Sequence, residues 1–368
     1  MRNHSKKASV GVTGKRTVGL DLGDRHSYYY TLDAVGENVE SGRVKTSGEG
    51  LEKRFGGQEA ARVVIEAGTH SPWVSRLLAG LGHEVIVANP RKVRLISDNE
   101  GKDDPVDAEL LARLGRVDVK LLSPIQHRGE AAQADLAVIR ARDALVGART
   151  QLVNHVRGAV KSLGSRLEKS STRSFGDKMG DQVPEALQEA LEPVLEVIKE
   201  LTSQIGGYDQ QIRKSCQEKY PETRLLTAVP GVGALTALGY VLTLEDPHRF
   251  ASSRAVGSFL GLRPGKDKSG QQDPELRITK AGSPLLRRLL VGSAHYILGP
   301  FGPDTDLRRW GLKLAGRGRK NAKKRAVVAV ARKLGVLLHR LWVHGEVYQP
   351  LYQAERAVAV TAVAGARS

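Results

Sequence analysis

The chain has 368 residues, which at roughly 100–200 residues per domain predicts two or three domains, each with room for a core. Its formal net charge of +17 favours a polyanionic partner, with nucleic acid ahead of an anionic membrane surface. No apolar run reaches the roughly 18 residues of a membrane span, and the N-terminus lacks the apolar part of a secretory signal. The single cysteine, Cys216, excludes an internal disulfide and a cysteine-based metal cluster, which fits a cytosolic protein.

Residues 1–15 are basic and polar and are predicted to form a disordered arm, and residues 16–125 are predicted to form an α/β domain. Strands are predicted at Thr17–Leu22, Ser27–Leu32, Val39–Val44, Arg62–Ile65 and Glu84–Val87, with helices near 71–81 and 105–115. Three consecutive strands followed by alternation of strands and helices predict a mixed sheet covered by helices.

Residues 126–220 are predicted to be helical, with two long amphipathic stretches. In the first, apolar residues recur every seven positions, at Ile139, Val146, Val153 and Val160. In the second they alternate at spacings of four and three, at Leu187, Leu191, Val194, Ile198, Leu201, Ile205, Tyr208 and Ile212. This spacing favours a coiled coil that joins protomers, and a helical hairpin within one chain explains it equally well. The polar segment 170–181 between the stretches is predicted to be a loop.

Residues 221–345 are predicted to form an α-rich domain, and the tail 346–368 is expected to be frayed. Residues 225–242 read as helix, Pro-Gly-Val-Gly, helix, which is typical of a helix-hairpin-helix. There Gly231 and Gly233 would let the backbone turn and approach a DNA phosphate, and a hairpin used only for packing is the alternative.

Residues 311–333 carry nine cations and no acid, which favours non-specific phosphate contact over a merely solvated helix face. These cations are Lys313, Arg317, Arg319, Lys320, Lys323, Lys324, Arg325, Arg332 and Lys333.

Four carboxylates form a candidate metal site. Asp21 ends the first predicted strand, Glu66 ends a later one, and Asp104 and Asp107 stand three residues apart where a helix begins. At one edge of a sheet such side chains would repel one another unless cations lay between them. Mg²⁺ or Mn²⁺ would suit these oxygen ligands, and a pair of ions could assist phosphoryl transfer. Taken singly, Asp21 could cap a turn and the helix acids could simply favour the helix dipole.

The order Asp, Glu, Asp-x-x-Asp in these contexts resembles the RuvC-like, RNase H-type DEDD domain of insertion-sequence transposases of the "IS-one-ten" type. Members carry Lys-Thr-Asp-x-x-Asp-Ala, and this chain reads Lys-Asp-Asp-Pro-Val-Asp-Ala at residues 102–108. Asp103 replaces the threonine and is therefore an alternative ligand to Asp104. The spacing to Asp107 favours Asp104.

The sequence after residue 245 resembles the second domain of the same family, so that the resemblance covers about residues 17–298. The matching motifs are Arg249-Phe250, Gly261-Leu262-Arg263-Pro264, Ser269-Gly270, Lys280-Ala281-Gly282 and Leu286-Arg287. The resemblance implies that Ser269 is a nucleophile. Candidates for holding the phosphate are Lys266, Lys268, Lys280 and Arg287. Ser258, in an apolar stretch, is predicted to be a packing residue.

The resemblance implies a DNA transposase or recombinase that forms a covalent phosphoserine with Mg²⁺-assisted carboxylates. It also implies a dimer or tetramer on double-stranded DNA, active sites shared between protomers, and a guide (bridge) RNA encoded by the element, all in the bacterial cytosol at the nucleoid. The alternatives are a metal-only nuclease or junction resolvase, in which Ser269 is incidental, and a non-enzymatic DNA-architectural protein. His26, His70 and His295 could support the metal ligands or carry protons, and the interpretation favoured for them is a structural one.

Overall fold

The computed structural model describes residues 14–93, 104–267, 276–318 and 321–352. The chain divides into two compact units, Met1–Arg128 and Gly129–Ser368. Within the described ranges, no helix combines the length and the apolar character needed to cross a membrane.

The first unit is built on a five-stranded mixed sheet in the order β3-β2-β1-β4-β5. The strands are β1 (Thr17–Asp21), β2 (His26–Leu32), β3 (Asn38–Lys45), β4 (Arg62–Glu66) and β5 (Glu84–Ala88). β1 pairs antiparallel with β2, and β2 with β3, whereas β1, β4 and β5 run parallel. All five predicted strands are confirmed to within one residue at each end, and the arrangement is consistent with an RNase H-like α/β domain.

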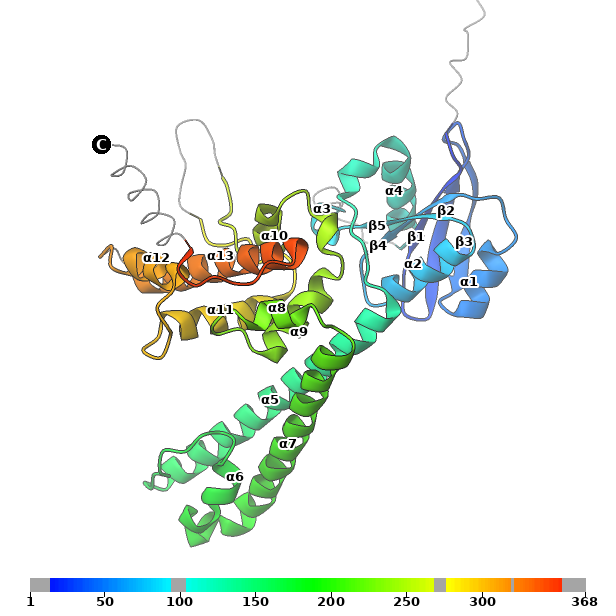
Figure 1. The fold of residues 1–368 in the computed structure, drawn as a ribbon. Helices are drawn as coiled ribbons and strands as arrows, with labels where there is room; N and C mark the ends of the chain where they lie inside the picture. The colour runs from blue at the N-terminus through cyan, green and yellow to red at the C-terminus, as the bar shows by residue number, and fades with distance from the viewer. Residues whose placement is uncertain (1–13, 94–103, 268–275, 319–320, 353–368) are drawn as a thin grey trace, which may run out of the picture. The chain divides into compact units, whose positions relative to one another are not determined.

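Both faces of this sheet are covered because its central strands are apolar on both sides (Figure 1). Val18 and Leu20 point to a core shared with α1 (Gly48–Phe55) and α2 (Ser71–Gly80). The alternate positions face α4 (Asp104–Val117), which packs against β1, β2 and β4. The short elements α3 (Pro90–Val93) and η1 (Val119–Leu122) complete the unit.

Helix α4 lies in backbone contact with β1, and Gly19 permits this approach. A Cβ atom on Gly19 would overlap the carbonyl oxygen of Ala108 and lie 2.5 Å from the amide nitrogen of Ala112. Further along the helix, a Cβ on Gly115 would collide with the Val64 side chain and lie 3.7 Å from Cγ2 of Thr17. The position of α4 is therefore fixed by two glycines, one on the strand and one on the helix.

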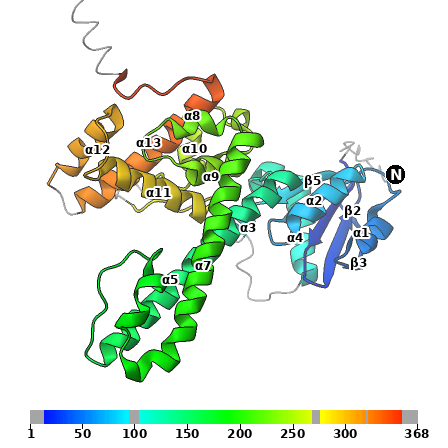
Figure 2. The ribbon, with the colours of Figure 1, turned by 60° about the horizontal axis from the view of Figure 1, so that its bottom comes forward.

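The second unit begins with two long helices, α5 (Glu130–Ser162) and α7 (Glu185–Glu218), joined through α6 (Phe175–Lys178) and η2 (Gly180–Gln182). They lie side by side in both views (Figures 1 and 2). They run antiparallel, because Arg142 bonds Asp209 whereas Arg149, further along α5, bonds the earlier Thr202. We call this element the α5–α7 hairpin.

The apolar spacing of α7 is confirmed at one set of positions and corrected at another. Leu191, Ile198, Ile205 and Ile212 are buried, as the seven-residue repeat predicts. The intervening buried position is Leu195, whereas Val194 is only half-buried. Its neighbour Pro193 lies inside the helix, where it cannot donate a backbone hydrogen bond.

The predicted loop at 170–181 is wrong in part, because it contains α6 and the start of η2. Phe175 and Met179 are fully buried between the long helices, in a core with Val156, Leu195 and Ile198. These two apolar residues stand among polar residues in the sequence. The free energy gained by burying them outweighs the tendency of the polar residues to form a loop.

The remaining helices pack around α13 (Ala322–His344), against which α8, α10, α11 and α12 lie. They are α8 (Thr223–Thr227), α9 (Ala234–Leu244), α10 (Ser253–Phe259), α11 (Pro284–Leu298) and α12 (Asp306–Ala315), with η3 (Pro247–Arg249) between α9 and α10. Tyr240 is fully buried and its hydroxyl donates to the Gly335 carbonyl at 2.5 Å. Leu238 and Leu242 of α9 also pack in a core with residues near the start of α5 and near the end of α7.

We predict that Gly19→Ala lowers the free energy of unfolding by about 3 kcal/mol, because the added methyl overlaps the α4 backbone, which cannot move aside as a flexible side chain could. Gly80→Ala is the matched control, since a Cβ there meets nothing within 4 Å. Thermal or denaturant unfolding measures both variants. A Gly19→Ala protein as stable as the control would contradict the close approach of α4 to β1.

Candidate active site

Asp21 and Glu66 end two neighbouring strands at the same edge of the sheet. Leu20 and Ile65 are register partners in the parallel pair β1–β4, so that each carboxylate follows one residue later on its own strand. Both side chains are half-buried. The two predicted strand-end acids are thus neighbours at the carboxyl edge of the central parallel strands.

The N-terminus of α4 lies at that same edge. Gly115, near the end of α4, lies over Thr17 at the start of β1, whereas Ala108 and Ala112 lie over Gly19. The helix therefore runs antiparallel to β1, and its first turn reaches the level where the strand ends. This turn carries the exposed Asp104 and the half-buried Asp107. Acids here also favour the helix dipole, so their placement suits the helix even without a ligand.

Asp24 and His70 lie beside this edge. His70 follows β4, and its Nδ1 accepts a hydrogen bond of 3.1 Å from Trp73 Nε1. An accepting Nδ1 leaves the proton of a neutral imidazole on Nε2, which lies 3.5 Å from Asp24 Oδ1. The interpretation of His70 as structural is compatible with these bonds, which fix its ring. Asp24 follows β1 and was not singled out by the sequence.

A buried serine that follows β4 contacts a histidine from far along the chain, and the sequence analysis missed both residues. The Ser71 hydroxyl accepts from the Gly68 amide at 2.9 Å and lies 2.8 Å from His127 Nε2. Burial lowers the pKa of His127, and the positive charges of Arg128 and Arg76 lower it further, so that the neutral imidazole is favoured. A Gly-x-x-Ser turn after a strand is the only local signal, and His127 reaches it through tertiary contact.

The donor chemistry at the sheet edge suits a hard divalent cation, since carboxylate oxygens are the ligands that Mg²⁺ and Mn²⁺ prefer. Within the ranges that the structure describes, no three His, Cys, Asp or Glu side chains are gathered closely enough to hold a metal ion. The strand register and the direction of α4 bring the four backbone positions to one edge. Their joint coordination of a cation stays a prediction.

Several predicted site residues lie outside the described residues, namely Asp103, Lys268, Ser269, Arg319 and Lys320. The chain on either side of the gap at 268–275 is paired. The Gly265 amide donates to the Arg277 carbonyl at 2.9 Å, and the Thr279 amide donates to the Arg263 carbonyl at 3.0 Å. Lys266, just before the gap, is exposed.

The motif glycines of the C-terminal domain hold this paired region against α10. Gly261 and Gly282 both have positive φ, of 67° and 69°. A Cβ on Gly261 would overlap Ala281, and a Cβ on Gly282 would overlap the Phe259 carbonyl. Only glycine allows this backbone-to-backbone contact.

Arg287, predicted to hold a phosphate, lies in the same region. Its Nη1 donates to the carbonyls of Leu260, Ala281 and Gly282, so that the guanidinium ties the motif segments together. The exposed Lys280, with φ of 54°, donates its amide to the Gly261 carbonyl.

Ser258 was predicted to be a packing residue, and this is wrong. It lies on α10 and is exposed, whereas Val256 and Gly257 on the other side of the helix are buried. The short helix turns its serine away from the core although its neighbours in the sequence are apolar.

The Pro-Gly-Val-Gly segment joins α8 to α9 and lines an open pocket of about 590 Å³. Gly231 has a φ of 83°, and a Cβ there would lie 2.9 Å from the Tyr296 ring. Gly233 precedes the first residue of α9, and a Cβ there meets nothing within 4 Å. The pocket is lined by Gly233 and Thr236 at the start of α9 and by Arg288.

The basic run of the C-terminal domain lies on the surface. Its described cations on α12, on the α12–α13 connection and on α13 are all exposed, at Lys313, Arg317, Lys323, Lys324, Arg325, Arg332 and Lys333. Lys333 lies over the Trp310 ring at 4.4 Å. The buried side of α13 is apolar, with Ala326, Val330 and Leu334 in the core.

Two family models match the chain in the order of its two halves. A model of DEDD transposases of the IS110 type, described as transposase, matches residues 18–164. A second, described as the transposase IS116/IS110/IS902 family, matches residues 223–303. The first covers the sheet, α4 and α5, and the second covers the region from α8 to α11.

Curated proteins named as transposases match most of the chain. The chain is 27% identical to a transposase for insertion sequence element IS1111A from Coxiella burnetii, over 95% of this chain and 96% of that one. It is 29% identical to a putative transposase from Sinorhizobium fredii, over 90% and 85%. It is 26% identical to a transposase for insertion sequence element IS1328 from Yersinia enterocolitica, over 75% and 82%. The chain belongs to the IS110-type family of DNA transposases.

Proposed function

We propose that this transposase cuts and rejoins insertion-sequence DNA through a covalent bond between DNA and Ser269, with Asp21, Glu66, Asp104 and Asp107 holding Mg²⁺ or Mn²⁺. The observation that carries the proposal is the register of β1 with β4 together with the antiparallel course of α4 over β1. The backbone positions of carboxylates from three separate elements share one edge of the sheet.

Divalent cations held there would neutralise the carboxylates and lower the charge that builds up on phosphate oxygens during transfer. Asp21 and Glu66, fixed at strand ends, would set the position of the phosphate relative to the sheet. Asp107, half-buried on the first turn of α4, would contribute a further oxygen ligand from the helix. Asp104 is more exposed and has room to adjust as the DNA enters.

In the proposed step the Ser269 Oγ loses its proton and attacks a DNA phosphorus, one phosphorus–oxygen ester bond breaks, and the departing sugar oxygen takes up one proton, so that no net proton is consumed. A phosphoserine diester conserves the energy of the broken bond, so that a sugar hydroxyl can reverse the step on a new strand. Lys266 and Lys280, exposed on either side of the gap that contains Ser269, would attract the phosphate. Arg287 would act mainly by holding the segments in place.

We further propose that the enzyme works as a dimer or tetramer, with Ser269 of one protomer serving the carboxylates of another and a guide RNA encoded by the element selecting the DNA. The apolar repeat of α7 is buried within the hairpin of one chain, so the proposed assembly rests on the family resemblance and not on this repeat. The exposed cations around α13 support backbone contacts with nucleic acid of either kind.

We propose that α8, the Pro-Gly-Val-Gly turn and α9 act as a helix-hairpin-helix on the DNA backbone. Free amides at a helix N-terminus bind phosphate, and Gly233 and Thr236 at the start of α9 line the open pocket. Arg288, which lines the same pocket, adds a positive charge.

We predict that Ser269→Ala abolishes the covalent protein–DNA species, because no hydroxyl remains to form the ester. The assay is a denaturing gel of the full chain with labelled donor and target DNA, with and without Mg²⁺ and co-expressed element RNA. Ser258→Ala, an exposed serine on α10, is the matched control and should retain the species.

Metal affinity of Ser269→Ala should equal that of the wild type, which separates loss of the nucleophile from loss of folding. Full strand cleavage by Ser269→Ala would instead support a metal-only nuclease. A covalent species that forms equally without the element RNA would refute the proposed guide.

We predict that Gly233→Asp weakens DNA binding about tenfold while folding stability is retained or rises slightly. Aspartate is a good N-cap at the extended backbone of residue 233, and its charge repels a phosphate at the α9 amides. Ser47→Asp, at the N-cap of α1, carries the same change to another helix as a control. Fluorescence anisotropy on duplex DNA measures the affinity, and equal affinities for Gly233→Asp and wild type would exclude the helix-hairpin-helix role.

A further inference from the structure

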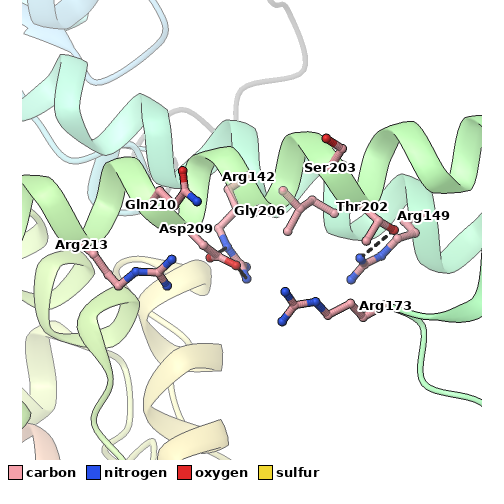
Figure 3. A pocket seen from close by; sticks show the side chains of 10 residues that line it. Arg142, Arg149, Arg173, Thr202, Ser203, Gly206, Asp209, Gln210 and Arg213 are labelled. Atoms are coloured by element: carbon pink, nitrogen blue, oxygen red, sulfur yellow. Dashed lines mark hydrogen bonds and ion pairs between the residues drawn. The ribbon is translucent and has the colours of Figure 1, made fainter.

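The α5–α7 hairpin carries a polar pocket of about 460 Å³ in the middle of its length, and none of the predicted site residues lines it. Arg142 and Arg149 enter it from α5, Arg213 and Asp209 from α7, and Arg173 from the segment before α6. Figure 3 shows the guanidinium groups of the first two and of Arg173 turned toward a common space. A helix pair that served only to pack would place apolar residues here.

The pocket has an excess of positive charge. Four arginines face one carboxylate, which leaves a formal charge of +3. Asp209 is already engaged, because Arg142 donates to it through Nε at 2.6 Å and through Nη2 at 3.4 Å. Arg173 and Arg213 are exposed at the mouth. The charge of the pocket is therefore not balanced by the groups that line it.

Arg149 gives the strongest indication of an absent ligand. Its side chain is among the most buried charged groups of the described chain, with the residue only 8% exposed. One Nη1 proton goes to Thr202 Oγ1 at 3.1 Å, and within the described residues its Nε has no hydrogen-bond partner. Burial lowers the pKa of Arg149, and the charges of Arg142 and Arg173 lower it further. A buried guanidinium with an unmet N–H is costly, and an anion would relieve both the charge and the missing acceptor.

The geometry of the guanidinium donors indicates which classes of anion the pocket would bind. Guanidinium groups present parallel N–H pairs that fit a phosphate or carboxylate in bidentate fashion. The exposed mouth admits a long polymer as readily as a small ion, and the family acts on DNA. We propose that the arginine pocket of the α5–α7 hairpin binds a backbone phosphate of duplex DNA. This contact goes beyond the strand-transfer chemistry, and a binding assay without cleavage tests it, so that either proposal can fail alone.

Two neighbouring glycines allow a test that leaves every charge in place. Gly206 lines the pocket and Gly207 does not, and a Cβ on either meets nothing within 4 Å. Gly206→Leu should fill the pocket, Gly207→Leu should leave it open, and both should strengthen the helix slightly. Arg173→Ala removes one charge at the mouth, and Arg140→Ala, exposed on α5 outside the pocket, is its control.

The measurement is fluorescence anisotropy of the full chain on a duplex DNA of mixed sequence, repeated over a series of salt concentrations. We expect Gly206→Leu and Arg173→Ala to bind about five- to tenfold more weakly, with the slope of log affinity against log salt reduced by about one. Gly207→Leu and Arg140→Ala should stay within twofold of the wild type. Equal binding by all four variants would overturn the proposal.

Three parallel measurements exclude other occupants. If affinity falls only for a structured RNA of the same length, the ligand is RNA and the DNA assignment is wrong. If inorganic phosphate raises the melting temperature of the wild type but not of Gly206→Leu, while DNA affinity is unchanged by the substitution, the pocket takes a free anion instead. If light scattering shows that Gly206→Leu changes the oligomeric state in the absence of DNA, an acidic side chain of a second copy occupies the pocket.

Discussion

The contact between the backbones of β1 and α4 is the constraint on which the proposed chemistry depends. Gly19 and Gly115 remove the side chains that would otherwise hold the helix away from the sheet. The helix can then lie in one place and one direction, with its N-terminus at the edge where Asp21 and Glu66 end their strands. A helix one side chain further away would move the backbone of Asp107 further from the ends of β1 and β4. The same two glycines thus fix the position of α4 on which the proposed site depends.

The sequence was informative wherever local pattern and burial agree. Five short apolar runs became strands because the central ones, such as Val63–Ile65, are buried on both faces. The first turn of α4 was predictable from Asp104-Pro105, since proline suits the start of a helix and acids favour its dipole. The strands and the start of α4 need no knowledge of distant contacts. The shared edge of Asp21 and Glu66 follows from the polarity of parallel strands once β1 pairs with β4.

Other features depend on partners far along the chain, and the sequence alone did not reveal them. Phe175 and Met179 form part of a helical core only because α5 and α7 enclose them. His127 meets Ser71 across 56 positions, and Arg287 reaches the Leu260 carbonyl across 27. The exposure of Ser258 depends on which side of α10 faces α13. Composition near each of these residues suggests a different role, and tertiary packing decides.

Each unit places several side chains of like charge in one region, which a folded chain ordinarily avoids. The sheet edge gathers acids, and the α5–α7 hairpin gathers arginines around Arg149. In the two proposals each arrangement would be balanced by a ligand of the opposite sign, a cation in the first case and a phosphate in the second. Together they would hold DNA along its length while one phosphodiester is brought to the metal ligands.

Calorimetric titration of Mn²⁺ into the full chain tests the central claim most directly. The account predicts that Asp21→Asn and Asp107→Asn each weaken binding at least tenfold with unchanged melting temperatures, and that Glu59→Gln, an exposed acid in the same unit, binds as the wild type does. Equal Mn²⁺ affinity in all four proteins would contradict a cation site at the shared edge of β1, β4 and α4.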